Sequence, residues 1–327
     1  MSTMPAETAA TIRRIREVLP PEAFSPNPRR LWVAALHSAV ILGSYATIRA
    51  FPAAAPLVSL AIGHSLACLA FVGHEVSHNA VVRGGVAKHA ITAWAFGLNM
   101  IPPAMWNRLH NDTHHRHTNT PADPDRPFLK SERQPSTTLY TAIFFPSRGI
   151  WRGNALVLAH FVTYIARNLL TVFYPGDTKP SVMTSKPAYR SHERAVIACE
   201  LIGVVTLQYL VWRAVGSSWR NYMWASPVAL CIASAVIMTY VFTNHFLNPI
   251  THEHDPLSGT TSVVVPTVFD HLHSNFSFHT EHHLFPTLNS DYYPLVSQLL
   301  QQEAGDRYQR LPMGEAWRKL WEQERFR

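Results

Sequence analysis

Three short histidine-rich motifs stand out in this chain: HEVSH at residues 74–78, HNDTHHRH at residues 110–117 and HTEHH at residues 279–283. Imidazole nitrogen is the side-chain ligand that iron, zinc and copper most often take near neutral pH. Histidines three or four residues apart on a helix project from one side of it, so each motif can aim several imidazoles at one point. The sequence therefore predicts a metal site that holds more than one ion.

Eight histidines of these motifs are the predicted metal ligands: His74, His78, His110, His114, His115, His279, His282 and His283. Eight imidazoles exceed the four ligands of a single zinc ion and suit two ions with about four or five nitrogens each. His245, at the end of the last apolar segment, is the predicted ninth ligand. Neighbours that could orient an imidazole or contact a bound water are Asn244, His117, Asp123 and Asp125.

The remaining polar residues near the motifs are not predicted to bind metal. Glu75 and Glu281 adjoin predicted ligands but are expected to point to a different face of their helices. Four histidines close to the motifs are expected to be solvated loop residues: His252, His254, His271 and His273. Three more lie in apolar segments and are expected to be buried with local partners: His37, His64 and His160.

Four apolar segments must position these motifs: residues 31–48, 56–72, 195–215 and 223–242. Each is about as long as a helix needs to be to cross a bilayer, ~17–25 residues. Weaker apolar stretches cover residues 90–104 and 155–173. The predicted fold is an all-α integral membrane protein with four transmembrane helices in two hairpins and a cytoplasmic helical cap that carries the histidine motifs.

The predicted organisation has three parts. Residues 1–30 form a cytoplasmic N-terminal segment, residues 31–300 the membrane domain, and residues 301–327 a basic cytoplasmic tail. In the first part four apolar residues share one helical face, as in a helix on a membrane surface, although a solvated helix fits the same pattern: Ile12, Ile15, Val18 and Leu19.

The charge distribution predicts an orientation and excludes some functions. Lys and Arg number 28 against 21 Asp and Glu, and the excess gathers at both termini and between the second and third apolar segments. By the positive-inside rule these regions, and with them all three motifs, are cytoplasmic. The basic balance suits anionic lipid and an acidic redox partner, and no nucleic-acid-binding motif occurs. The three cysteines form no CxxC pair, which excludes an iron–sulfur cluster and a zinc ribbon.

The three motifs in this order resemble those of the membrane fatty acid desaturase superfamily: H-x(3–4)-H, H-x(2–3)-H-H and H-x-x-H-H. The stretches WNRLHNDTHHRHTNTPADPD and FHTEHHLFPTLNSDYYPLV are similar to bacterial acyl desaturases. The resemblance implies that the histidines hold a non-haem di-iron centre. With O₂ and two electrons, that centre would abstract hydrogen from an unactivated carbon of a fatty acyl chain carried as free acid, CoA ester, carrier-protein ester or lipid.

The electrons would have to come from a separate protein. The chain has no cytochrome b5-type haem segment and no G-x-G-x-x-G nucleotide motif. A ferredoxin, a rubredoxin or a cytochrome b5, each with its reductase, is the expected donor. It would dock on the basic face, where the candidate residues are Arg108, Arg116, Lys130 and Arg133.

Several alternatives stay open at this point. Relatives with the same motifs include hydroxylases, acetylenases and alkene-forming decarboxylases. The local sequence of the third motif favours desaturation over these reactions. The outcome depends on where the chain lies relative to the metals, to within about an ångström. HEVSH also matches H-E-x-x-H, so a membrane zinc protease using His74, Glu75 and His78 is a remote alternative. Metal storage or transport is a third.

Overall fold

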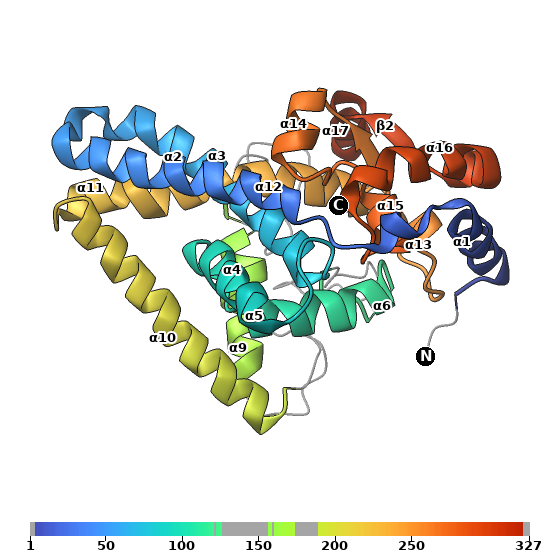
Figure 1. Cartoon of the computed structure of the whole chain (residues 1–327), viewed down its shortest axis with the longest axis horizontal. Coiled ribbons are helices and arrows are strands. Elements are labelled where there is room, and N and C mark those ends of the chain that lie inside the picture. The colour runs from blue at the N-terminus through green and yellow to red at the C-terminus, as the bar shows by residue number, and fades with distance from the viewer. Residues whose placement is uncertain (1–3, 121, 126–155, 159, 174–188, 323–327) are drawn as a thin grey trace.

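The computed structural model describes residues 4–120, 122–125, 156–158, 160–173 and 189–322. Figure 1 shows a chain folded almost entirely into helices. Four of them are long and apolar enough to cross a membrane: Pro28–Ala50, Pro52–Ser77, Ser191–Ala214 and Trp219–His245. These overlap the four apolar segments predicted from the sequence, so the expectation of a helical chain with four candidate spans is confirmed.

Helix α3 (Ala55–Ser77) is the central element of the apolar part. It packs along α2 (Leu31–Ala50), to which the short helix η3 (Pro52–Ala54) joins it, and along α12 (Ala229–His245). The α3–α12 contact is close because Gly63 has no side chain. A Cβ atom there would lie 2.5 Å from Cβ of Ile232 and 2.7 Å from the carbonyl oxygen of Ala229. This approach fixes where the C-terminal ends of α3 and α12 stand relative to each other.

Helix α10 (Ser191–Ala214) diverges from the other spans, as Figure 1 shows. It connects through α11 (Trp219–Met223) and the π-helix η7 (Trp224–Val228) to α12, and it packs on α4 (Gly85–Leu98) and α5 (Pro103–Trp106). Only 17% of its apolar window is buried. Its exposed side chains include Ile202, Val205 and Leu210, which is the surface that lipid would cover.

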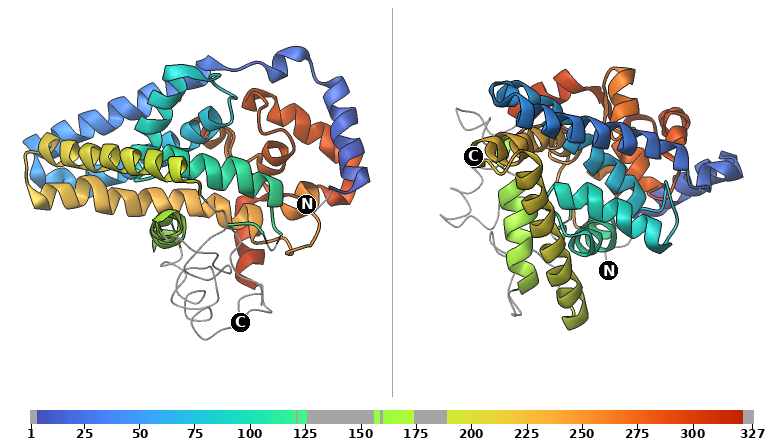
Figure 2. Two further views of the ribbon diagram at one scale, coloured as in Figure 1. Left: turned by 90° about the horizontal axis from the view of Figure 1, so that it is seen from below. Right: turned by 60° about the vertical axis from the view of Figure 1, so that its left-hand side comes forward.

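The C-terminal elements and α1 (Ala6–Val18) gather at one end of the spans, away from the α2–α3 and α10–α12 connections, as both views in Figure 2 show. We call this part the cap. Its core includes Ile15, Leu19, Phe285 and Leu300. The remaining cap elements are η1 (Pro21–Phe24), η2 (Pro28–Arg30), α13 (Pro256–Gly259), β1 (Ser262–Val264), α14 (Thr267–Leu272), α15 (His279–Leu284), η8 (Ser290–Tyr292), α16 (Tyr293–Ala304), η9 (Gly305–Arg307), β2 (Arg310–Pro312) and α17 (Met313–Glu322).

Two features of the cap differ from the sequence-based expectation. Residues 301–322 are not a tail, because β2 pairs in parallel with β1 and α17 packs on α12. Hence the boundary expected at residue 300 does not end the fold, and a two-stranded sheet interrupts the all-α pattern. At the N-terminus, α1 packs on α16. Of its apolar face, Ile15 and Leu19 are buried in the cap core while Val18 is 65% exposed.

The segment between α3 and α10 carries the second histidine motif. It contains α4, α5, the π-helix η4 (Asn107–His114), α6 (His115–His117), the π-helix η6 (His160–Ala166) and α9 (Arg167–Phe173). The predicted docking residues Lys130 and Arg133 lie outside the described residues. So does the side chain of His160, for which only the backbone is described.

The close helix contact at Gly63 predicts a stability defect. In Gly63→Ala the new methyl group would clash with a carbonyl oxygen, which cannot move without displacing α12. We expect a loss of about 1–3 kcal/mol of stability, typical of overpacking, seen as a lower melting temperature of the detergent-purified protein. Gly43→Ala in α2 is the control, since a Cβ there meets nothing within 4 Å. Equal melting temperatures for the two variants would contradict this reading of the contact.

Candidate metal centre

The first motif lies at the C-terminal end of α3. His74 is in its last turn and His78 is its C-cap, and a positive φ of 62° at Asn79 turns the chain away. The two imidazoles lie on one side of the helix, with ring centroids 4.8 Å apart. This is the arrangement that a spacing of four residues predicts.

The second motif departs from the expected geometry because it is a π-helix. The backbone N–H of His115 bonds to the carbonyl of His110, five residues earlier. This wider turn brings their side chains together, with the two Nε2 atoms 3.2 Å apart. The spacing of four residues also brings His110 near His114, because ligand atoms of His110, His114 and Asp125 lie within 4.8 Å of one another. His114 in addition groups with His245 and His283.

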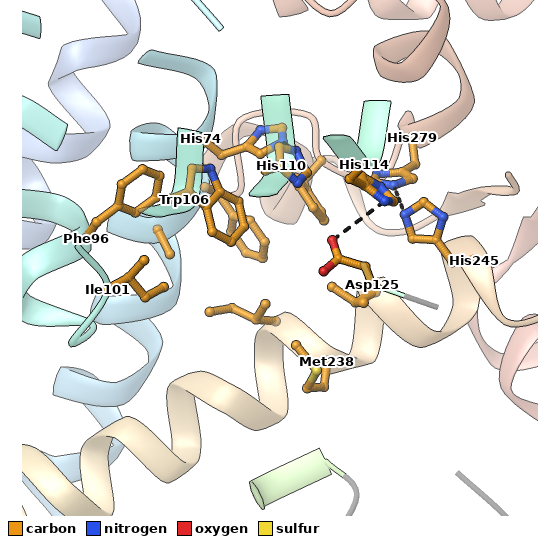
Figure 3. A pocket seen from close by; sticks show the side chains of 15 residues that line it. His74, Phe96, Ile101, Trp106, His110, His114, Asp125, Met238, His245 and His279 are labelled. Atoms are coloured by element: carbon orange, nitrogen blue, oxygen red, sulfur yellow. Dashed lines mark hydrogen bonds and ion pairs between the residues drawn. The ribbon is translucent and has the colours of Figure 1, made fainter. Parts of the chain in front are cut away.

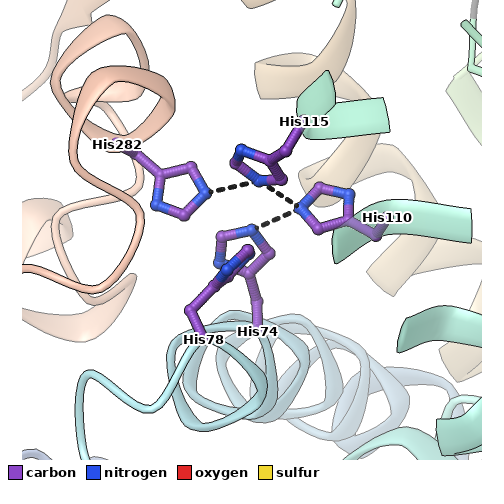
Figure 4. Close-up of side chains that lie close together, drawn as sticks. All are labelled: His74, His78, His110, His115 and His282. Carbon is purple, nitrogen blue, oxygen red and sulfur yellow. Dashed lines mark hydrogen bonds between the residues drawn. The ribbon is translucent and has the colours of Figure 1, made fainter. Parts of the chain in front are cut away.

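Five imidazoles from the three motifs converge at one point, which we call the five-histidine centre (Figure 4). Its ligand atoms all lie within 4.8 Å of one another. Successive Nε2 atoms are close: 2.9 Å from His74 to His110, and 3.1 Å from His115 to His282. The members are His74 and His78 of α3, His110 and His115 of the second motif, and His282 of α15.

A second group, which we call the four-histidine centre, forms beside the first. Nitrogens of His114, His245 and His283 lie within 4.8 Å of one another. The Nε2 atom of His279 joins them, 2.7 Å from Nε2 of His245 and 3.1 Å from Nε2 of His283. The third motif thus contributes to both centres. His279 and His283, four residues apart on α15, join the four-histidine centre, and His282 joins the five-histidine centre.

The chemistry of these donors fits metal ions. Burial lowers the pKa of six of the imidazoles well below the usual value: His78, His110, His115, His279, His282 and His283. They are therefore neutral at neutral pH, with lone pairs available. The Nε2 atom of His78 is buried and has no hydrogen-bond partner among the residues that the structure describes. Ligands around one ion at ~2.0–2.1 Å stand about 2.9–3.3 Å apart, which matches the spacings found here.

Carboxylates and hydroxyls contact the outer nitrogens of several imidazoles. Asp123 Oδ1 lies 2.8 Å from Nδ1 of His114, and Asp125 Oδ2 lies 3.6 Å from the same atom. Thr118 Oγ1 is 3.1 Å from Nδ1 of His283. Such partners fix the tautomer and orientation of a metal-binding imidazole.

Glu75 corrects one sequence-based expectation. It was expected to point away from the histidines, yet its Oε1 lies 3.2 Å from Nδ1 of His74 and 3.8 Å from Nδ1 of His282. The side chain that directly follows a histidine on a helix can contact the Nδ1 atom of its imidazole, and residue spacing alone does not predict this contact. Tyr293, whose hydroxyl is 3.1 Å from Nδ1 of His282, was not found from the sequence at all.

Glu281 holds the third motif in place from the far side. Its carboxylate is fully buried and accepts hydrogen bonds from the hydroxyls of Ser262, at 2.5 Å, and Tyr308. Burial raises the pKa of this carboxyl above its usual value. These bonds attach α15 to β1 and to the segment before β2, so the histidine-bearing helix is fixed in the cap.

The other candidate residues take varied positions. Asn244 is fully buried, and neither atom of its side-chain amide has a hydrogen-bond partner among the described residues. His117 is half-buried and belongs to neither centre. His252 and His271 are exposed as expected. His254 and His273 are buried, so the expectation that they are solvated is wrong for both.

An apolar cavity lies against both centres (Figure 3). Histidines of both groups form one wall: His74, His110, His114, His245 and His279. The rest of the lining is largely hydrocarbon and aromatic and includes the carboxylate of Asp125; the apolar side chains are those of Phe96, Ile101, Trp106, Ile237, Met238 and Phe276. A cavity with this lining suits an alkyl chain held beside the imidazole nitrogens.

Comparison with known proteins gives one family. The family model described as fatty acid desaturase matches residues 49–315, which include every element that carries a histidine of the two centres. No curated protein matches the chain.

The contact between Asp123 and His114 predicts a change in metal binding. Asp123→Asn removes the negative charge that orients His114, so we expect metal affinity of the four-histidine centre to fall by ~10–100-fold. Metal per chain, measured by mass spectrometry after dialysis against a chelator, reports the change. Asp112→Asn is the matched control, since Asp112 is exposed and pairs with Arg108. Full metal retention in Asp123→Asn would contradict the assignment.

Proposed function

This chain belongs to the fatty acid desaturase family, and from that premise we propose that it is an O₂-dependent di-iron oxidoreductase. It acts on an unactivated C–H bond of a fatty acyl chain, as a desaturase. The observation that carries the proposal is the pair of imidazole groups in the wall of one apolar cavity. Four apolar helices and the family indicate a membrane protein, and an acyl substrate partitions into the same lipid phase.

Iron suits the site better than zinc. Cleavage of an alkyl C–H bond exceeds what amino-acid side chains can do, so a redox metal must supply it, and zinc has no redox chemistry. The five-histidine and four-histidine centres would each hold one iron. When bound, the two irons would supply O₂ activation and hydrogen abstraction.

The residues of this chain would do the positioning. Phe96, Ile101 and Met238 give the cavity an apolar surface that holds the acyl chain and excludes water. Asp123 and Glu75 keep imidazoles turned toward the centres. Asn244 lies next to His245 with both amide atoms unpartnered, which suits a hydrogen bond to a water at the four-histidine centre.

The alternative reactions differ in how well they fit the family and the contacts of Glu75. Terminal-alkene-forming decarboxylation, hydroxylation and triple-bond formation start with the same abstraction, and product analysis separates them from desaturation. The zinc-protease alternative is disfavoured by the family and by Glu75. That carboxylate contacts the outer nitrogens of His74 and His282, whereas a protease needs it beside a metal-bound water.

The electron donor and the orientation are parts of the same proposal. A separate ferredoxin, rubredoxin or cytochrome b5 with its reductase would supply the electrons on the cytoplasmic side, where the positive-inside rule places the cap. Arg116 is exposed near the second motif and could contact such a donor, whereas Arg108 already pairs with Asp112.

Product analysis tests the reaction. We expect that expression in a host with a competent donor system yields new unsaturated fatty acids, because the cavity holds a saturated chain against both centres. Gas chromatography with mass spectrometry of total fatty acids measures this. Shortened terminal alkenes or hydroxy acids in their place would reassign the outcome within the family. No new product from an iron-loaded protein with a working donor would refute acyl oxidation.

Removal of one predicted ligand tests the metal assignment. We expect His279→Ala to hold no more than about one iron, and to lose more activity than the ~10–100-fold that loss of an outer partner causes. Iron content and Mössbauer spectra of iron-57-grown protein measure this. His271→Ala, an exposed histidine eight residues earlier, is the control and should keep both properties. A fully active His279→Ala would argue against the four-histidine centre.

A further inference from the structure

A third group of side chains that can bind a metal ion lies between α2 and α3, away from the two histidine centres. Ligand atoms of His37, His64 and Cys68 are within 4.8 Å of one another. His37 and Cys68 are buried and His64 is half-buried. We propose that these residues, with His273 of the cap, form a mononuclear site for a thiophilic d¹⁰ cation, Zn²⁺ or Cu⁺.

The spacing of the donor atoms fits one ion. Nε2 of His64 lies 3.2 Å from Nε2 of His273, and Sγ of Cys68 lies 3.8 Å from both ring nitrogens of His64. A tetrahedral ion with ~2.0–2.1 Å bonds to nitrogen and ~2.3 Å to sulfur sets its ligands about 3.3 Å (N···N) and 3.6 Å (N···S) apart. The 3.2 Å separation also falls in the range found within the five-histidine centre.

Hydroxyl groups orient two of these imidazoles as metal ligands are oriented elsewhere. Nδ1 of His37 is 3.0 Å from Oγ of Ser65, which leaves Nε2 buried and without a partner in the part of the chain that the structure describes. Nδ1 of His273 is 2.8 Å from the hydroxyl of Tyr240, which leaves Nε2 facing His64. A fixed outer nitrogen with a free inner lone pair is the usual state of a metal-binding imidazole.

The donor set selects the class of ion. One thiolate with neutral imidazoles favours Zn²⁺ or Cu⁺, and no carboxylate belongs to the group, so Ca²⁺ and Mg²⁺ are poor candidates. Binding would deprotonate Cys68 and release one proton. An aromatic pair separates the site from the five-histidine centre, because Phe71 contacts His273 while Phe276 contacts both Phe71 and His74.

A cation bound at this site would link the segment before the third motif to α2 and α3. His37 is in α2, His64 and Cys68 are in α3, and His273 precedes His279 by six residues. A cation bound to all four would therefore fix the segment that leads into α15. This inference does not depend on the reaction at the histidine centres, and its test does not use activity.

Metal analysis of the purified full-length protein tests the site. The protein is dialysed and loaded in separate samples with zinc, or with copper under reducing conditions. We expect one zinc or copper per chain in addition to iron, and X-ray absorption at that metal's edge should show a sulfur neighbour at ~2.3 Å. The edge that shows sulfur decides between the two ions.

Two variants connect that signal to the cluster. Cys68→Ser should abolish the sulfur neighbour and weaken binding of the extra metal at least ~tenfold, while the iron content stays the same. Cys231→Ser in α12 is the matched control and should change neither. The absence of sulfur at both edges of the unaltered protein, or its persistence in Cys68→Ser, would overturn the proposal. The cluster would then be a hydrogen-bonded network without a metal.

Discussion

The convergence of nine imidazoles on two points, eight of them buried and that of His115 half-buried, is the constraint on which this structure depends. Lone pairs aimed at one another at 2.7–3.2 Å gain little without a cation or a shared proton. Burial favours the neutral forms, as the lowered pKa values of His110 and His283 show. The protein must therefore hold the rings by contacts outside the centres.

Those contacts form a frame of polar bonds between distant segments. The side-chain amide of Asn119, just after the second motif, donates to the carbonyls of His245 at 3.0 Å and Gly259 at 2.6 Å. This attaches the second motif to the end of α12 and to α13. Glu281 attaches the third motif to Ser262 and Tyr308. Close packing at Gly63 sets the separation of α3 and α12. Each of the hydrogen bonds joins a histidine-bearing segment to another element, so loss of one bond would displace a histidine without removing it.

Residue type and spacing were enough to predict the four candidate spans, because a bilayer requires apolar length and little else. They also identified every histidine that the structure brings into the two groups. They did not predict the π-turn, which places Nε2 of His115 3.2 Å from Nε2 of His110. They failed too for Glu75 and His273, whose surroundings come from α15 and from α3. Periodicity describes one element at a time, and these contacts join several.

The two groups differ in their number of imidazoles, and this difference affects what each group could bind. Five imidazoles converge in one group and four in the other, and members of both face the same cavity. The first group would offer an ion five imidazoles and the second group four. Asn244 is buried next to His245, and neither atom of its side-chain amide has a hydrogen-bond partner among the described residues. The four-histidine centre therefore combines fewer imidazoles with a neighbouring hydrogen-bonding group, in the wall of the same apolar cavity.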